Sequence, residues 1–315
     1  MRTIKRRFRS LALAARKRLA GTPAIRKLYI SAVRIKLDVL EDLRIGRLRL
    51  PSRHQAPSGN SAGVVVSLTS YPARIDSAWI PIELMLRQDR VPDRVVLVLS
   101  DEEFPTRQIP KKLLEQQKRG LEILWVPETL RCHQKLIPTR IAYPEATIIT
   151  IDDDCFYEEW LVGRLVASTE EHPGEIIGFR GWEVRWHESG LAPYVRWKRA
   201  GSATPSESVF LTGVGGIAYP PTVLPVDLVA DIALMRALCP TNDDIWFWAI
   251  AHVAESPARC LGMTSYHQLR RQRDTPKLQL ENRDGGMNDR QLASAIEHFG
   301  IESTLEHFGI ESTSP

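Results

Sequence analysis

The feature that most constrains the fold is an alternation of short apolar runs with longer amphipathic stretches between residues 63 and 154. Four runs rich in Val, Ile and Leu have the length and composition of buried strands: 64–68, 95–99, 121–126 and 147–151. Helical periodicity predicts helices between them, at 78–88, 111–119 and 134–142. Because strands that alternate with helices usually pair in parallel, we expect an α/β fold with a mainly parallel sheet flanked by helices on both faces.

The fourth apolar run ends in three consecutive carboxylates, Asp152, Asp153 and Asp154. Since a hydrophobic core does not accept unpaired carboxylates, we expect a cation beside them. A divalent ion, Mn²⁺ or Mg²⁺, is the natural candidate because oxygen ligands and substrate phosphates hold such ions. An acidic turn that caps the strand and faces water is the simpler alternative.

Polar stretches follow three of the predicted strands. They are 69–74, 100–104 and the triple Asp itself. In open α/β sheets, ligands bind beyond the carboxyl ends of the strands. The position of the three carboxylates therefore favours a binding site over a solvated turn.

The second half of the chain has a less regular pattern. It predicts a helix over 158–171, strands over 175–180, 194–197 and 260–266, and a last helix over 288–300. Three of the eight tryptophans lie within 181–197, where either core packing or stacking on a sugar ring would account for them. A glycine-rich stretch, 210–221, does not have the spacing of a P-loop or of GxGxxG, so those modes of nucleotide binding are not indicated.

A second acidic pair, Asp243 and Asp244, opens a predicted helix over 240–251. Asn242 or Asp243 can cap this helix, and an acid in its first turn complements the helix dipole. Capping explains one carboxylate better than two. A carboxylate at a helix N-terminus beside a cleft is also well placed to act as a base.

Most of the positive charge lies in the first 53 residues, where 16 Lys and Arg and three acidic residues give a net charge of +13, against −9 for the remainder. Apolar residues recur there at helical spacing, at Ile4, Phe8, Leu11, Ala15 and Leu19. The pattern predicts a basic amphipathic helix suited to an anionic membrane surface, and a solvated extension is the alternative. Nucleic acid is not an expected partner, because few aromatic residues accompany the charges and the acidic remainder would repel a phosphate backbone.

A stretch rich in Pro, Ser and Gly, 51–63, reads as a linker. We therefore expect a basic helical arm and linker at 1–56, a catalytic domain at 57–300 and a tail at 301–315. The end of the chain repeats a nonapeptide, at 296–304 and 305–313, which we interpret as a local duplication.

Cysteine usage and hydropathy predict a cytoplasmic protein. The four cysteines lie far apart, at Cys132, Cys155, Cys239 and Cys260, without the spacing of a zinc site or a disulfide framework. The sequence contains no run of about 18 apolar residues, so it predicts no membrane-spanning helix. Together with the basic arm, this favours a peripheral position on the inner face of the cytoplasmic membrane.

Seven segments, taken in order, resemble the bacterial glycosyltransferases of the GT-A type, particularly those that build surface polysaccharides. They are VVVSLTSYPARI at 64–75, GLEILWV at 120–126, HQKLIP at 133–138, YPEATIITIDDD at 143–154, TGVGGIAYPP at 212–221, NDDIWFWAIA at 242–251 and MNDRQL at 287–292. The ordered set extends over roughly three quarters of the chain and is more specific than any one motif.

The resemblance implies a Rossmann-like fold and a metal-dependent hexosyltransferase of enzyme class EC 2.4. It would use a UDP- or GDP-sugar donor and a glycan or lipid-linked acceptor. The family's DxD metal site falls on Asp152 and Asp154, with Asp152 also near the ribose and Asp153 expected to point away. A late histidine, His267, would complete the metal site, although a structural role is the alternative for it.

The resemblance also implies roles for residues outside the DxD motif. Thr69, Tyr71 and Arg74 would bind the base and ribose, and Lys135 could neutralise a phosphate or simply be an exposed helical lysine. Gly215, Gly216 and Trp246 would shape the acceptor side. Asp243 or Asp244 would be the general base in an inverting reaction, or would orient the acceptor in a retaining one.

Two other classes of function stay open at this point. A metal-dependent phosphohydrolase or nucleotidyltransferase could use the triple Asp together with Asp243 and Asp244 as a two-metal site. A non-catalytic carbohydrate-binding protein could instead use the tryptophan-rich stretch.

Overall fold

The computed structural model describes residues 39–50, 56–187, 190–204, 206–269, 282 and 286–301. Two compact units are present, Met1–Pro51 and Ser52–Pro315. The described part of the first unit contains a helix at 39–48. The amphipathic helix predicted in the arm and the second nonapeptide copy lie outside the described residues, and the boundaries expected at 56 and 300 stay predictions.

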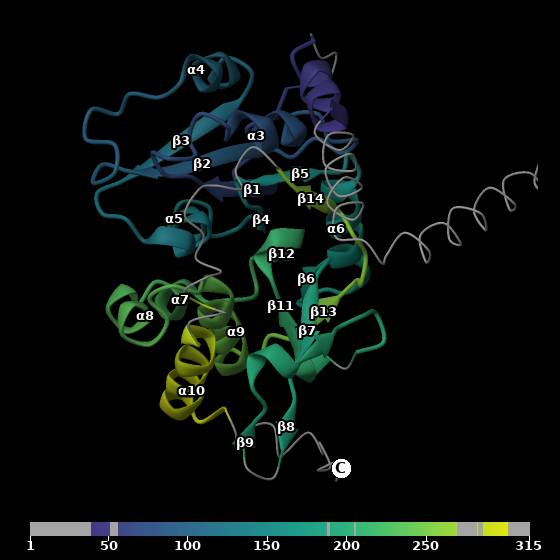
Figure 1. The fold of residues 1–315 in the computed structure, drawn as a ribbon, viewed down its shortest axis with the longest axis vertical. Helices are drawn as coiled ribbons and strands as arrows, with labels where there is room; N and C mark the ends of the chain where they lie inside the picture. The colour runs from purple at the N-terminus through teal and green to yellow at the C-terminus, as the bar shows by residue number, and fades with distance from the viewer. Residues whose placement is uncertain are drawn as a thin grey trace, which may run out of the picture. The chain divides into compact units, whose positions relative to one another are not determined.

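A seven-stranded sheet forms the centre of the second unit, in the order β13-β6-β12-β4-β1-β2-β3 (Figure 1). Its strands are β1 Val64–Thr69, β2 Arg94–Ser100, β3 Leu121–Val126, β4 Thr147–Thr150, β6 Ile176–Gly178, β12 Ile217–Tyr219 and β13 Ala258–Cys260. All neighbouring strands pair in parallel except β12, which is antiparallel to both β4 and β6. The predicted mainly parallel α/β sheet is confirmed.

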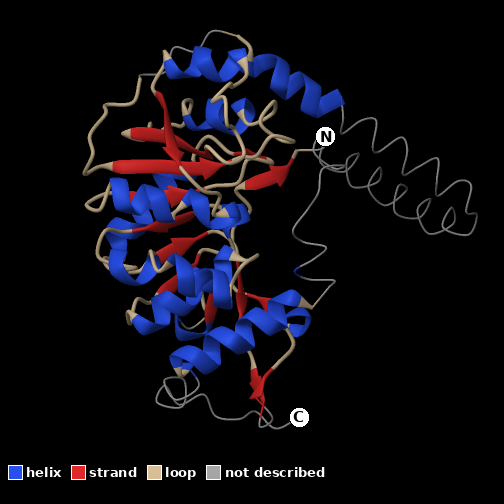
Figure 2. Cartoon of the chain, turned by 90° about the vertical axis from the view of Figure 1, so that its left-hand side faces the viewer, coloured by secondary structure: helices blue, strands red, loops and turns tan. Residues whose placement is uncertain are grey.

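Helices flank this sheet on both sides, as the sequence predicts. They are α3 Trp79–Met85, α4 Lys111–Gln117, α5 Ile137–Ala142, α6 Leu161–Glu171, α7 Val226–Val229, α8 Ile232–Leu238, α9 Asp243–Val253 and α10 Met287–Phe299. In Figure 1, α5 and α9 lie on one side of the central strands and α6 lies on the other. Figure 2 shows the strands running through the unit with helices beside them. No helix in the described residues is both long enough and apolar enough to cross a membrane.

Short strands complete the second half of the chain. A three-stranded sheet contains β7 Gly181–Glu183, β10 Lys198–Arg199 and β11 Val209–Leu211. Two separate antiparallel pairs are formed by β8 Trp186–His187 with β9 Gly190–Leu191 and by β5 Cys155–Tyr157 with β14 Tyr266–Gln268. The strand predicted at 194–197 is wrong, because the chain forms a 3₁₀ turn at Tyr194–Arg196 directly after Pro193. The strand predicted at 260–266 is also wrong. Gly262 has a φ of 64° between β13 and β14 and turns the chain there.

Lys135 does not lie on the long helix predicted at 134–142. A 3₁₀ helix, Arg131–Lys135, precedes α5, and Pro138 occupies the first turn of α5. Proline is favoured in a first turn, where its missing N–H removes no helical hydrogen bond. This break fixes Lys135 at the end of a tight turn, with only 6% of the residue exposed.

Arg140 on α5 ties the helix to the loops at the ends of β4 and β12. Its guanidinium is buried and donates hydrogen bonds to the carbonyl oxygens of Pro144, Ala146, Tyr219 and Pro220, at 2.9 to 3.3 Å. Ala146, Tyr219 and Pro220 are buried residues, whereas Pro144 is exposed, so three of the four carbonyls are poorly placed to pair with water if the donor is lost. Arg140 therefore connects segments about 80 positions apart in the chain.

Replacing Arg140 with Met keeps much of the buried volume but leaves several carbonyl groups unpaired. We expect the free energy of unfolding to fall by about 3 kcal/mol or more, because each buried unsatisfied group costs about 1–3 kcal/mol. Urea denaturation followed by circular dichroism measures it. The control is Arg90→Met, which removes an exposed ion pair to Glu170 and should cost less than about 1 kcal/mol. Equal losses in the two variants would contradict this account of Arg140.

Candidate active site

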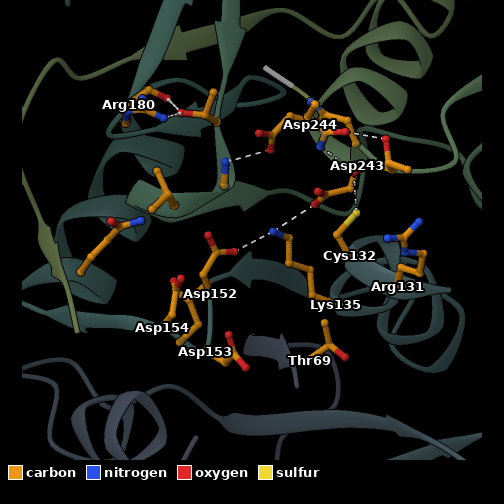
Figure 3. Close-up of a pocket in the computed structure, with 18 of the residues that line it drawn as sticks. Thr69, Arg131, Cys132, Lys135, Asp152, Asp153, Asp154, Arg180, Asp243 and Asp244 are labelled. Atoms are coloured by element: carbon orange, nitrogen blue, oxygen red, sulfur yellow. Dashed lines mark hydrogen bonds and ion pairs between the residues drawn. The ribbon is translucent and has the colours of Figure 1, made fainter. Parts of the chain in front are cut away.

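One polar cavity of about 820 Å³ opens at the carboxyl ends of β1 and β4. Its walls come from segments far apart in the sequence: the loop after β1, the 3₁₀ helix at 131–135, the triple Asp after β4, the turn after β11 and the start of α9. Figure 3 shows the carboxylates of Asp152, Asp243 and Asp244 grouped around Lys135. Predicted sites at two separate positions in the sequence thus belong to a single cavity.

Lys135 lies between the two acidic groups. Its Nζ is 2.8 Å from Asp152 Oδ1 and 3.0 Å from Asp243 Oδ2, and the contact with Asp243 is an ion pair rather than a well-aligned hydrogen bond. Burial by itself would lower the pKa of Lys135, but Asp152, Asp243 and Asp244 together hold that pKa well above its usual value. The ammonium group is therefore a fixed positive charge at the centre of the cavity.

Gly213, in the turn after β11, makes room for this ion-pair cluster. A Cβ atom placed there would lie 2.8 Å from Lys135 Nζ and 3.3 Å from Asp244 Oδ1. Its backbone N–H donates a 2.9 Å hydrogen bond to Asp244 Oδ1. The glycine-rich stretch thus comes closest to the cluster at Gly213, where a side chain would collide with it.

Arg74 neutralises the other two carboxylates of the triple Asp. Its guanidinium lies 3.0 Å from Asp153 Oδ1 and 3.3 Å from Asp154 Oδ2, and Ser70 Oγ donates a 2.6 Å hydrogen bond to Asp153 Oδ2. Burial raises the pKa of Asp153 to about 6, against the opposing effect of Arg74 and Ser70. In Figure 3 the carboxyl of Asp153 points away from Lys135.

Asp243 and Asp244 are held at the N-terminus of α9. Asn242 caps this helix by accepting a hydrogen bond from the N–H of Ile245. Burial, together with the negative charge of Asp243, raises the pKa of Asp244 to about 7, while Lys135 acts in the opposite direction. Asp244 is therefore poised to exchange a proton near neutral pH.

The structure brings most of the predicted residues to the cavity. Its lining contains Thr69, Tyr71, Arg74, Lys135, Asp152, Asp153, Asp154, Asp243 and Asp244. Lys135 is buried and ion-paired, so its interpretation as an exposed helical lysine is wrong. Arg74 lies over the ring of Tyr71, 5.4 Å from its centroid, which fixes the loop after β1.

Four predicted residues do not line the cavity. Trp246 is fully buried, and its indole N–H donates to the carbonyl of Val229. Gly215 and Gly216 pack against Arg180 and Leu161 behind the wall. His267 alternates along β14 with Tyr266 and Gln268, which do face the cavity, and its ring stacks on Phe156 at 5.0 Å. Trp246, Gly215 and Gly216 therefore do not shape the acceptor side as predicted. His267 does not face the cavity in which it was expected to bind the metal.

Sequence reasoning missed several residues that line the cavity, among them Arg180, Trp182, Asn282 and Asn288. Asn288 lies in the closing MNDRQL segment and accepts a 2.8 Å hydrogen bond from Asn242, so it supports the start of α9. Arg180 donates to Thr212 Oγ1 at 2.8 Å and lies over the ring of Trp182. The cluster of tryptophans at 181–197 could have pointed to Trp182 as a cavity residue. No feature of the sequence pointed to Arg180.

The chemistry of the cavity fits a divalent cation that arrives with an anionic ligand. Its lining contains six carboxylates, counting Glu103, and four basic side chains, so it has no surplus positive charge for a diphosphate. Asp152 and Asp154 both line the cavity, and divalent ions of this kind are commonly held by one or two carboxylates plus phosphates. Within the described residues, no group of three or more His, Cys, Asp or Glu is arranged to hold a metal ion.

Comparisons with known proteins give structural similarity only. No protein-family model and no curated protein sequence matches the chain. Similar solved structures include 4-diphosphocytidyl-2C-methyl-D-erythritol synthase, with 11% identity over 73% of this chain and 98% of that one and a TM-score of 0.42. TarS 1–349 from S. aureus in complex with UDP has 14% identity over 76% and 72% of the two chains and a TM-score of 0.39. The structure of GalNAc-T7 with UDP, GalNAc and Mn²⁺ has 11% identity over 68% of this chain and 45% of that one, with a TM-score of 0.43. At these values, none of them assigns a ligand or a residue role to this chain.

Replacing Lys135 with Met tests the ion-pair cluster through the pH dependence of stability. Because the pKa of Lys135 is raised in the folded state, its stabilising contribution is complete below pH about 10 and is lost only above it. In the variant the buried carboxylates lose their cation, so we expect a loss of about 3–5 kcal/mol at pH 8. The loss should shrink toward pH 5, because Asp244, whose pKa burial already raises to about 7 with Lys135 present, is protonated there and no longer needs the cation.

Urea denaturation at pH 5 and pH 8 measures both values. The control is Lys118→Met, an exposed lysine at the end of α4, which should change stability by less than about 0.5 kcal/mol at either pH. A loss for Lys135→Met that is the same at both pH values would show that the carboxylates do not depend on the ammonium group.

Proposed function

We propose that the protein is a GT-A type glycosyltransferase that moves a sugar from a UDP- or GDP-sugar to a hydroxyl of a glycan or lipid-linked acceptor. The observation that supports it most is the arrangement of two acidic groups around one cavity, with Lys135 between them. The first group, Asp152 to Asp154, suits the diphosphate end of a donor with its metal. The second, Asp243 and Asp244, suits the acceptor end.

On the donor side, Thr69, Tyr71 and Arg74 follow β1 and would contact the base and ribose. Asp152 and Asp154 would hold Mn²⁺ or Mg²⁺, which supplies positive charge to the departing nucleoside diphosphate when it is bound. Lys135 is buried and held in place, so it can add a second positive charge without reorganising. Arg74 keeps the carboxyl of Asp153 in the wall.

On the acceptor side, Asp244 is the better candidate for the general base. Its pKa of about 7 allows it to take a proton from a hydroxyl at neutral pH, and the Gly213 N–H fixes one of its oxygens. Asp243 is held by Lys135 and would act as a positioning residue. This assignment corresponds to an inverting reaction, and in a retaining one Asp244 would orient the acceptor.

The position of Lys135 weighs against a two-metal phosphohydrolase or nucleotidyltransferase. Two-metal sites hold their ions about 3.5–4 Å apart between shared carboxylates. Here an ammonium group occupies the space between Asp152 and Asp243. A non-catalytic sugar-binding role accounts for neither this cluster nor the raised pKa of Asp244.

We extend the proposal to a hexosyltransferase of cell-surface polysaccharide synthesis, peripheral on the inner face of the cytoplasmic membrane. The resemblance of the seven segments and the basic composition of residues 1–53 support it. Binding of the protein to vesicles with and without anionic lipid tests the membrane part separately from the reaction.

The donor part is tested by a screen of UDP- and GDP-sugars, reading the released nucleoside diphosphate with and without Mn²⁺. We expect release with at least one donor, dependent on the metal, and a fall of about 10²–10³-fold in Asp154→Asn because charge on the leaving group is no longer compensated. His267→Ala, outside the cavity, should keep most of the activity. Release of phosphate or pyrophosphate instead would contradict the proposal.

The base is tested by the pH dependence of kcat/KM with the donor so identified. Because Asp244 must be deprotonated to accept a proton, kcat/KM should fall about tenfold per pH unit below its pKa of about 7. In Asp244→Asn this limb should vanish and the rate should fall by about 10²–10⁴-fold. An unchanged acid limb in Asp244→Asn would assign the base to another residue.

A further inference from the structure

A second cavity, of about 430 Å³, lies between α9 and strands β6, β11 and β12, which are neighbours in Figure 1. Apolar side chains form most of its wall, among them Ile176, Val209, Leu211, Ile217, Phe247 and Ala251. Its lining contains no Lys or Arg. Protein interiors have few voids larger than a water molecule, so an apolar space of this size is suited to a ligand.

The lining of the cavity includes exposed residues as well as buried ones. Glu255 and Pro257 are exposed, whereas Val209 and Ile217 are almost completely buried. Asp244 is the one described residue that lines both this cavity and the polar cavity of the candidate active site. A molecule bound in the apolar cavity would therefore lie beside the proposed base.

Trp248 supplies an independent sign of a ligand. It lies one helical turn after Asp244 on α9, lines the apolar cavity and is only 6% exposed. Its indole N–H is buried and has no acceptor among the described residues. Because a buried donor without a partner costs free energy, an oxygen of a bound molecule is a natural partner for it.

We infer that this cavity binds the hydrocarbon part of the acceptor, whose oxygen-bearing head lies beside Trp248 and presents its hydroxyl to Asp244. The inference rests on the proposed glycosyltransferase function for its biological meaning, but the binding itself does not require a donor. The head is uncharged, because a fatty-acid carboxylate would face Asp244 in a lining whose one basic side chain is His252, with no Lys or Arg. The class of acceptor is thus a neutral amphiphile with a hydroxyl or glycosidic head.

Octyl β-D-glucopyranoside, kept below the concentration at which it forms micelles, is the probe. Calorimetric titration of the full chain without nucleotide or metal should give saturable binding at one site. Sodium octanoate, which has a similar chain and a charged head, should bind at least about tenfold more weakly, because a carboxylate would be buried unpaired. Comparable or tighter binding of octanoate would overturn the assignment of a neutral head.

Two substitutions place the probe in this cavity. Ala251→Leu fills the space and should weaken binding about tenfold or more, and Trp248→Phe removes the indole N–H at nearly constant shape and should weaken it about three- to tenfold. The matched control is Val253→Leu, which enlarges an exposed side chain of α9 outside the lining and should leave binding unchanged. Circular dichroism checks that each variant folds. If Ala251→Leu does not fold, the comparison of Trp248→Phe with the control still tests the inference.

Absence of saturable octyl glucoside binding to the wild-type chain would overturn the inference, as would equal binding by Trp248→Phe and the control. Binding of UDP or GDP with Mn²⁺ to the polar cavity, measured on the same variants, separates the two proposals. If neither UDP nor GDP binds with Mn²⁺, the glycosyltransferase function is contradicted, while octyl glucoside binding still reports on the apolar cavity.

Discussion

The ion-pair cluster around Lys135 is the interaction on which the candidate site depends. Its ammonium group is buried and joins Asp152, at the end of a central strand, to Asp243, at the start of α9. Without it, the carboxylates of Asp152, Asp243 and Asp244 would share one cavity without the cation between them, and a partly buried unpaired charge costs several kcal/mol. The 3₁₀ turn before α5 and the missing side chain at Gly213 both serve to admit this lysine.

The same cluster explains how two carboxylate pairs acquire different chemistry. Asp152 and Asp154 lie at the end of a parallel sheet, where other polar loops converge. Asp244 lies at the start of α9, accepts a hydrogen bond from the Gly213 N–H, and has a pKa raised to about 7 by burial and by the charge of Asp243. When aspartates of one site lie in different surroundings, their pKa values differ. One carboxylate can then bind a cation while another acts as a base.

The sequence predicts the sheet and the triple Asp well because both depend on local patterns. Apolar runs such as 64–68 and 147–151 define strands by composition, and the parallel order places Asp152 at the ligand-binding edge. The prediction for His267 came from the family resemblance, and in the structure side chains alternate along β14, so its ring packs on Phe156 while its two neighbours line the cavity. Arg180 and Asn288 reach the cavity through tertiary packing between distant segments, for which a single sequence has no local signal.

Each carboxylate of the triple Asp already pairs with a protein cation, Asp152 with Lys135 and Asp153 and Asp154 with Arg74, so a divalent ion should bind well only together with the nucleotide. Titration of Mn²⁺ followed by electron paramagnetic resonance, without nucleotide and with UDP or GDP, measures this. We expect one Mn²⁺ bound per chain with one of the two nucleotides and binding weaker by about tenfold or more without either, since the ion needs phosphate ligands. Equally tight Mn²⁺ binding without nucleotide, or no Mn²⁺ binding with either UDP or GDP, would refute this dependence.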